Sequence, residues 1–175
     1  MPARRNGPVS SNVSHYERRQ MKSIIRAAIA VFALTAGIVF ADSVHGISKR
    51  EILPHLDEML LAANAHDTDR FMVAFVQSPE LVFTIHDMTI IGWKELREQQ
   101  LKWWDYGKAK VQYAERTTPI FRPLGQDLVV TVQSLTARTS LPDGTTRNKN
   151  LSFTAIWKKL PQGWRIVVAH ESFAK

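Results

Sequence analysis

Four long strand-like runs in the second half of the chain restrict its fold more than any other feature. They cover residues 109–121, 127–139, 147–159 and 164–173, and they are rich in β-branched and aromatic side chains. The turn sequence "LPDG" follows the second run and "LPQG" follows the third, as expected for hairpin connections. Because a hairpin joins neighbouring antiparallel strands, this half of the chain predicts an antiparallel sheet.

Helical patterns come before these strands. Apolar residues recur at helical spacing over residues 48–67, where Pro54 predicts a kink or a later helix start. Asp67 is a suitable N-cap for a second, short helix, which should stop before Pro79. A third helix is predicted over residues 93–107.

The segment "LVFTIHDMTIIG" lies between the second and third helices and predicts two short strands. A turn at His86 and Asp87 joins them, and turn chemistry alone is enough to explain the aspartate. Helices first and an antiparallel sheet afterwards define an α+β domain. The length of 175 residues and the apolar content of 45% suit one domain with one core.

The composition excludes several kinds of functional site. The chain has no cysteine, so disulfides, thiolate zinc sites and a cysteine nucleophile are excluded. None of its six histidines is paired at i and i+4 or stands in a recognised chelate spacing. Gly-rich phosphate loops and a G-x-S-x-G elbow are also missing from the sequence. We therefore predict no metal and no cofactor.

The first 41 residues have the pattern of an export leader. A basic flank precedes the apolar run "AAIAVFALTAGIVF" (27–40), and small residues follow before Asp42. The run is shorter than the roughly 20 apolar residues of a membrane-spanning helix. We expect a signal peptide over residues 1–41, cleaved after Ala41, with an uncleaved anchor as the alternative. The residues before Met21 are either an extended n-region or precede the true start.

Export would leave a periplasmic or secreted domain over residues 42–175 with no stable membrane span. The formal net charge of +7 is concentrated in the leader, which holds six of the 23 basic residues and one of the 16 acidic ones. The remaining 17 basic and 15 acidic residues nearly cancel. The mature domain therefore gives no reason to expect a nucleic-acid partner.

Three segments in this order resemble a known family. They are "AANAHDTDRFMVAF" (62–75), "IIGWKELREQQ" (90–100) and "GWRIVVAHES" (163–172), the last at the end of a long meander. Their order and spacing resemble the SnoaL-like group of the nuclear transport factor two superfamily over residues 47–174. The resemblance implies a cone, in which a curved antiparallel sheet wraps around about three N-terminal helices and leaves a central pocket.

The resemblance also implies a homodimer that pairs through the outer face of the sheet. It does not assign an activity, because the superfamily contains steroid isomerases, dehydratases, polyketide cyclases and proteins without chemistry. Ketosteroid isomerases use an aspartate base, a tyrosine and a protonated aspartate. Alignment through residues 62–75 places the tyrosine near Met59, the aspartate base at Phe83 to Ile85 and the second aspartate near Phe153. These positions are almost wholly apolar, with Thr84 the only polar one. That mechanism is therefore not expected here.

In the superfamily, the closing-strand face that begins with the Trp of "GW" lines the pocket. The resemblance thus implies that Trp164, His170 and Ser172 point inward and Glu171 points outward, because side chains alternate along a strand. The inward set includes further residues of this strand, Ile166 and Val168, and of its neighbours, Val129, Thr131, Gln133, Leu135, Leu151, Phe153, Ala155 and Trp157.

The expected ligand-binding residues follow from this assignment. His170 and Ser172 would hold the polar end of a ligand, with His170 as the candidate general acid/base of an enzyme. The alternative is that the two side chains only satisfy each other or the backbone. Three aromatic residues would stack on the body of the ligand, or belong to the core instead: Trp93, Trp104 and Tyr113.

Three functions remain open at this point. The first is a domain that binds a small, mainly apolar molecule in its pocket, without established catalysis. The second is an isomerase, cyclase or dehydratase of small molecules that uses His170, with hydrogen-bond donors from Ser172, Gln133 or Thr131. The third is a dimerisation module whose pocket is filled by side chains.

Overall fold

The computed structural model divides the chain into two units, Met1–Ser43 and Val44–Lys175. It describes residue 46 and residues 48–174, all of which belong to the second unit. The predicted leader, its cleavage after Ala41 and the question of the true start lie outside the described residues. In the described part of the chain, no helix is long and apolar enough to cross a membrane.

In the described residues, three helices precede or interrupt the strands, close to the predicted positions. The first helix is continuous over residues 48–65, and Pro54 lies inside it. The alternative prediction of a later helix start is therefore wrong. Helix α2 spans Thr68–Met72, and the side chain of Asp67 accepts a hydrogen bond from the Arg70 amide as its N-cap. Helix α3 spans Trp93–Trp103 and is followed by the 3₁₀ turn η1, Asp105–Gly107.

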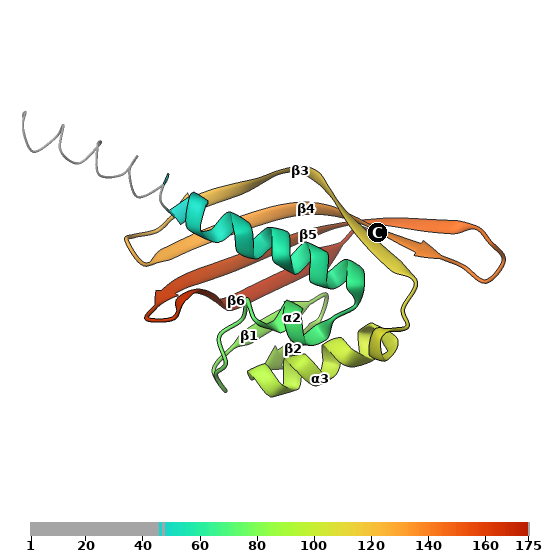
Figure 1. Ribbon diagram of the computed structural model, residues 1–175, viewed down its shortest axis with the longest axis horizontal. Coiled ribbons are helices and arrows are strands. Elements are labelled where there is room, and N and C mark those ends of the chain that lie inside the picture. Colours follow the sequence, from blue (N-terminus) through green and yellow to red (C-terminus); the bar gives the residue numbers. More distant parts are fainter. Residues whose placement is uncertain (1–45, 47, 175) are drawn as a thin grey trace, which may run out of the picture. The chain divides into compact units, whose positions relative to one another are not determined.

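Within residues 48–174, six strands form one open sheet in the order β2-β1-β6-β5-β4-β3 (Figure 1). Their bounds are β1 Val82–Ile85, β2 Met88–Ile91, β3 Val111–Pro123, β4 Leu128–Ser140, β5 Thr146–Leu160 and β6 Gly163–Phe173. Strands β3 to β6 pair antiparallel at each step of the meander, and β1 and β2 form an antiparallel hairpin, but β1 and β6 run parallel. The sheet is therefore mixed, not purely antiparallel as predicted. The α+β class is confirmed.

The first helix lies across one face of β3 to β6, and the core forms between them (Figure 1). Ile52 and Leu56 of this helix are at most 1% exposed, as are Val129 and Trp157 of the sheet. Burial of each such side chain stabilises the fold by about 1.5–3 kcal/mol relative to leaving it exposed. The helix face and the sheet face thus enclose one common core.

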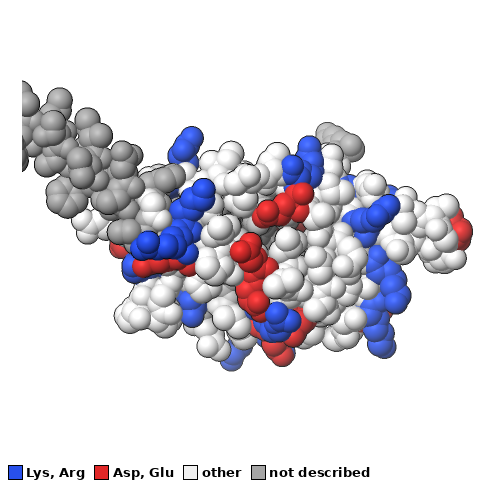
Figure 2. All heavy atoms as spheres, turned by 45° about the horizontal axis from the view of Figure 1, so that its top comes forward, with Lys and Arg blue, Asp and Glu red and all other residues white. Residues whose placement is uncertain are grey.

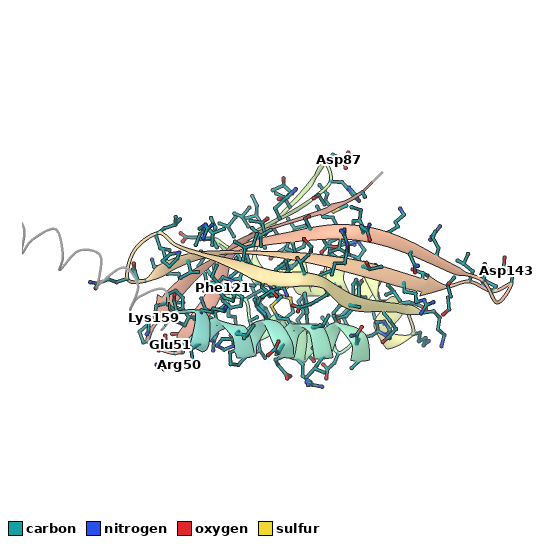
Figure 3. The ribbon with its side chains drawn as sticks, turned by 90° about the horizontal axis from the view of Figure 1, so that it is seen from above. Arg50, Glu51, Asp87, Phe121, Asp143 and Lys159 are labelled. Atoms are coloured by element: carbon teal, nitrogen blue, oxygen red, sulfur yellow. The ribbon has the colours of Figure 1, made fainter. Side chains whose placement is uncertain are left out.

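An ion pair and a hydrogen bond fix the first turns of this helix to the sheet. Glu51 Oε2 accepts hydrogen bonds from Lys159 Nζ at 2.8 Å and from Trp164 Nε1 at 2.7 Å. Figure 3 shows Glu51 and Lys159 together at this end of the helix, while Asp143 marks the tip of the β4–β5 hairpin at the opposite end. Trp164 is 3% exposed, so Glu51 supplies the acceptor that a buried indole N–H requires.

Charged side chains of both signs are interspersed over the face that Figure 2 shows. The ion pairs Arg70–Glu58 and Arg97–Asp69 are surface contacts in which each partner remains substantially exposed. Such pairs contribute little to stability. The mixed surface agrees with the near balance of charge in residues 42–175.

Candidate functional site

A cavity of about 230 Å³ lies between the first helix, the end of α3 and the inner face of the sheet. Most of its wall is apolar and aromatic. Four polar side chains also line it: Gln100, Tyr113, Gln133 and Glu171. A hollow of mainly apolar character with a few polar groups is the usual form of a small-molecule site.

Glu171, which was predicted to face outward, lines the cavity because β6 contains a β-bulge. Ile156 of β5 pairs with Val168, but the next residue, Trp157, pairs with Ile166, so Val167 has no partner in the ladder. One extra residue shifts the alternation by one position. Beyond the bulge, the inward residues are Ala169, Glu171 and Phe173.

The prediction that His170 and Ser172 point into the pocket is therefore wrong. His170 is exposed, and its Nδ1 lies 2.7 Å from the hydroxyl of Thr84 on β1. Ser172 pairs with Ser152 of the neighbouring strand β5 and does not line the cavity. Val168, also expected inside, is 37% exposed. The inward assignment of Trp164 and Ile166 holds, since both precede the bulge and are buried.

At the bulge, the edge of β6 opposite β5 changes its neighbour. Ile166 exchanges two backbone hydrogen bonds with the segment after α2, from Ile166 N to Ala74 O at 2.8 Å and from Val76 N to Ile166 O at 2.9 Å. Two residues later the same edge pairs with β1, where Val168 is opposite Val82. The two partners are paired with β6 one after the other, and one extra residue in β6 can accommodate the difference between their registers.

The Glu171 carboxyl stands in apolar surroundings. Its cross-strand neighbours are Phe153 on β5 and Ile85 on β1, and both also line the cavity. The residue keeps part of its accessible surface because it borders the hollow, yet burial raises the pKa of its carboxyl from 4.5 to about 7. In the described residues, no hydrogen bond to this side chain offsets the desolvation.

Tyr113 brings a hydroxyl to the same cavity. The hydroxyl accepts a hydrogen bond from Trp104 Nε1 at 3.4 Å, so its own hydrogen remains available to donate. Burial raises the pKa of Tyr113, the Trp104 hydrogen bond lowers it, and the negative charge of Glu171 raises it further. The two ionisable groups of the cavity are thus electrostatically coupled.

The side chain of Asn64 fixes the position of Tyr113. Its Nδ2 donates to the Tyr113 carbonyl at 3.0 Å and its Oδ1 accepts from the Tyr113 amide at 2.6 Å. His66 adds a ring hydrogen bond from Nε2 to the Val111 carbonyl at 2.8 Å. The end of the first helix is therefore tied to the beginning of β3, next to the cavity.

The two glutamines differ in how they are held. Gln133 Nε2 donates a hydrogen bond to Glu115 Oε1 at 3.1 Å. The Gln133 carbonyl oxygen remains available to accept a hydrogen bond. Gln100 is 6% exposed, and its amide has no hydrogen-bond partner among residues 48–174. Both amides can therefore take part in hydrogen bonds to a bound molecule.

The structure places only part of the predicted site at the cavity. Trp104, Tyr113, Gln133 and Phe153 line it. Trp93 is instead packed against the core, where its Nε1 donates to the Met72 carbonyl at 3.3 Å. Thr131 is fully buried and accepts a hydrogen bond from Trp157 Nε1 at 2.9 Å, so its hydroxyl serves the core.

Sequence reasoning did not select Glu171, Gln100 or Trp103 as ligand-binding residues. Trp103 and Trp104 both reach the cavity because Trp104 has left the helical conformation, with φ −95° and ψ 16°. Gln100 was one helical turn before Trp104, and this spacing was the signal that could have found it. At the positions aligned with isomerase catalytic residues, Met59, Ile85 and Phe153 give the cavity apolar walls.

Metal-binding side chains do not gather in the part of the chain that the structure describes. No group of three His, Asp or Glu side chains there could hold a metal ion. Asp67 and His86 have local roles, since Asp67 caps α2 and the His86 ring contacts Phe173 with ring centroids 5.4 Å apart.

Comparison with known proteins agrees with this architecture. One similar structure is a nuclear transport factor 2-like superfamily protein from Salmonella enterica, with a TM-score of 0.61 and 24% identity over 74% of this chain and 94% of that one. Another is an NTF2-like protein with a cystatin-like fold from Novosphingobium aromaticivorans, with a TM-score of 0.62 and 11% identity over 82% and 88% of the two chains. No curated protein matches the sequence.

A third structure, a candidate dehydratase of the NTF2-like family from Streptomyces avermitilis, gives a TM-score of 0.61 and 12% identity over 74% of this chain and 98% of that one. At these identities the likeness concerns the fold. The cone with a central hollow thus defines an NTF2-like domain. The SnoaL-like domain family matches residues 52–175, and the chain belongs to that family.

Proposed function

We propose that this domain binds a small, mainly apolar molecule in the cavity between the first helix and the sheet. The observation that carries the proposal is the hollow of about 230 Å³ itself, with aromatic walls and four polar side chains. A dry cavity of about 150 Å³ is enough to hold benzene. The volume therefore suits a single-ring molecule with one polar substituent, which Glu171 and Tyr113 would hold in place of the predicted His170 and Ser172.

The hollow also argues against a pairing module with a filled pocket. Pairing of two copies remains part of the proposal, because apolar side chains lie on the outer face of the sheet. Ile120 there is 50% exposed and Val168 is 37% exposed. We further propose that the leader directs the domain to the periplasm or the exterior, on the pattern of residues 1–41 alone.

A second candidate function is catalysis of the isomerase or dehydratase type. One observation favours it: a buried carboxyl whose pKa is raised to about 7 can both accept and donate a proton near neutral pH. Glu171 would then replace His170 as the general acid/base, with Tyr113 as the hydrogen-bond donor next to it. Loss of turnover with unchanged ligand affinity in Glu171→Gln would favour catalysis over binding alone.

A cavity-filling variant tests the binding proposal. Ala63 lines the hollow on the first helix, and Ala63→Leu would fill part of it at a position where leucine suits a helix. Ala65→Leu makes the same change two residues later at an exposed position, and serves as the matched control. Benzyl alcohol is a neutral probe of suitable size, and its binding can be followed by the fluorescence of Trp103 and Trp104.

We expect benzyl alcohol to bind the protein and the Ala65→Leu variant equally, and Ala63→Leu at least about 10-fold more weakly, because the added side chain takes the volume that the ring needs. Native mass spectrometry of the purified protein would identify a molecule that remains bound. Equal binding by both variants, or no binding of apolar probes to the protein at all, would contradict the proposal.

A further inference from the structure

The Glu171 carboxyl lacks the partner that a buried acid normally has. Its neighbours across the sheet, Phe153 and Ile85, are apolar, and no described residue donates a hydrogen bond to it. A buried carboxylate is strongly disfavoured unless a cation or hydrogen-bond donors stand next to it. The structure thus contains a half-completed pair, whose open side faces the cavity.

The rest of the lining does not supply the missing cation. Among the described residues that line the cavity, none is lysine, arginine or histidine. One N–H of the Gln133 amide group is engaged with Glu115, and the Gln133 carbonyl oxygen can accept a hydrogen bond. An anionic ligand would therefore meet a second negative charge and no counter-charge.

The aromatic residues of the wall favour a positive charge further. Six rings border the hollow: Phe71, Trp103, Trp104, Tyr113, Phe153 and Phe173. The faces of such rings attract cations, with tryptophan the most effective, and the attraction increases where water is excluded. A cation on this wall gains from the rings and from the carboxylate together.

We propose that the ligand is a small ring-bearing amine, bound as the ammonium ion, with the carboxylate of Glu171 as its counter-ion and the aromatic wall around its ring. This inference rests on the proposed binding function and names the ligand class. The ammonium group donates up to three hydrogen bonds, for which Glu171 and the carbonyl oxygens of Gln133 and Gln100 are available acceptors. One ligand group thus completes the pair that the chain leaves open.

Binding of such an ion must depend on pH, because only the ionised carboxyl attracts it. The other ionisable groups that face Glu171 are few. Tyr113 lines the same cavity from β3, Glu115 is hydrogen-bonded to Gln133, and the His86 ring contacts Phe173 at the end of β6. With the pKa of Glu171 at about 7, the ionised fraction rises about 10-fold between pH 6 and pH 8.

The test compares three probes of one shape: benzylamine, benzyl alcohol and benzoate. We expect benzylamine to bind tightest and benzoate weakest, and benzylamine affinity to be about 10-fold higher at pH 8 than at pH 6. Glu171→Gln should lower benzylamine affinity by about 10- to 100-fold, as for loss of a charged hydrogen-bond partner, with little change for benzyl alcohol. Binding is measured by calorimetry.

Two variants serve as controls. Glu80→Gln removes an exposed glutamate and should leave all three affinities unchanged. His86→Asn removes the nearby histidine, and asparagine tolerates the φ of +52° at that position. The pH dependence of benzylamine binding should persist in His86→Asn and disappear in Glu171→Gln.

The outcomes separate this inference from the function on which it rests. Suppose that benzyl alcohol binds and Ala63→Leu prevents its binding, but the protein binds benzylamine no tighter than benzyl alcohol. The proposal of an amine ligand is then wrong, and the proposed binding function stands. If none of the three probes binds, both are wrong. Should Glu171→Gln fail to fold, the probe ranking and the pH dependence of the unmodified protein still decide, and a preference for benzoate would overturn the inference.

Discussion

Replacement of Glu171 by glutamine should stabilise the unliganded protein at neutral pH. The unfolded chain exposes the carboxyl, whose ordinary pKa is 4.5, whereas burial in the fold raises the pKa to about 7. Between these values the folded protein holds the proton more firmly than the unfolded chain. The contribution of Glu171 to stability is therefore fully present below about pH 4.5 and is lost as the pH rises to about 7.

The magnitude follows from the same two values. At about 1.4 kcal/mol per pH unit, the interval from 4.5 to about 7 corresponds to about 3 kcal/mol, an upper value because the side chain borders a hollow that water can enter. Glutamine is uncharged throughout and nearly the same shape. The free energy of unfolding of Glu171→Gln, minus that of the unmodified protein, should thus increase by up to about 3 kcal/mol between about pH 4 and pH 8.

Urea unfolding followed by tryptophan fluorescence measures this difference at each pH. Comparing two proteins cancels the other carboxylates, which titrate in both. Glu80→Gln, at an exposed position, is the control and should give a difference that does not vary with pH. A difference for Glu171→Gln that is constant to within about 0.5 kcal/mol, the usual range for surface substitutions, would refute the reasoning.

Three further predictions follow from the fold. His170→Ala should leave the affinity for benzyl alcohol unchanged in calorimetry, since His170 lies on the outer face of the sheet. A several-fold loss of affinity would mean that His170 belongs to the binding site. Glu51→Ala should lower the free energy of unfolding by about 1–3 kcal/mol in urea titrations, because the buried Trp164 N–H loses its acceptor; an unchanged midpoint would contradict this. Ile120→Lys should convert a dimer to a monomer in sedimentation equilibrium, whereas a dimer that persists would place pairing elsewhere.

The sequence was sufficient to predict where strands begin and end. The predicted run 127–139 became Leu128–Ser140, and the strands around His86 and Asp87 occur where expected. These features depend on neighbouring residues: β-branched runs favour strands, and the sequences "LPDG" and "LPQG" close hairpins. Local signals of this kind are present in a single sequence.

The facing of the last five residues of β6 was not predictable in the same way. Alternation alone places Glu171 outside and His170 inside, and "RIVVAH" contains no glycine or other local sign of a bulge. The extra residue arises where Ile166 pairs with the segment at Ala74 and Val76, about 90 residues earlier in the chain. Because that pairing is a tertiary contact, the site residue it selects emerges only in the folded structure.

Carbon-13 NMR of the glutamate side-chain carboxyls tests the central claim most directly, since it reports on Glu171 without any ligand. One carboxyl resonance should titrate with a midpoint near 7, and it should be missing from the spectrum of Glu171→Gln. That result would place the carboxyl in a desolvated position inside the fold. If every glutamate of the protein titrates near the ordinary pKa of about 4.5, Glu171 lies in water and the proposed site is wrong.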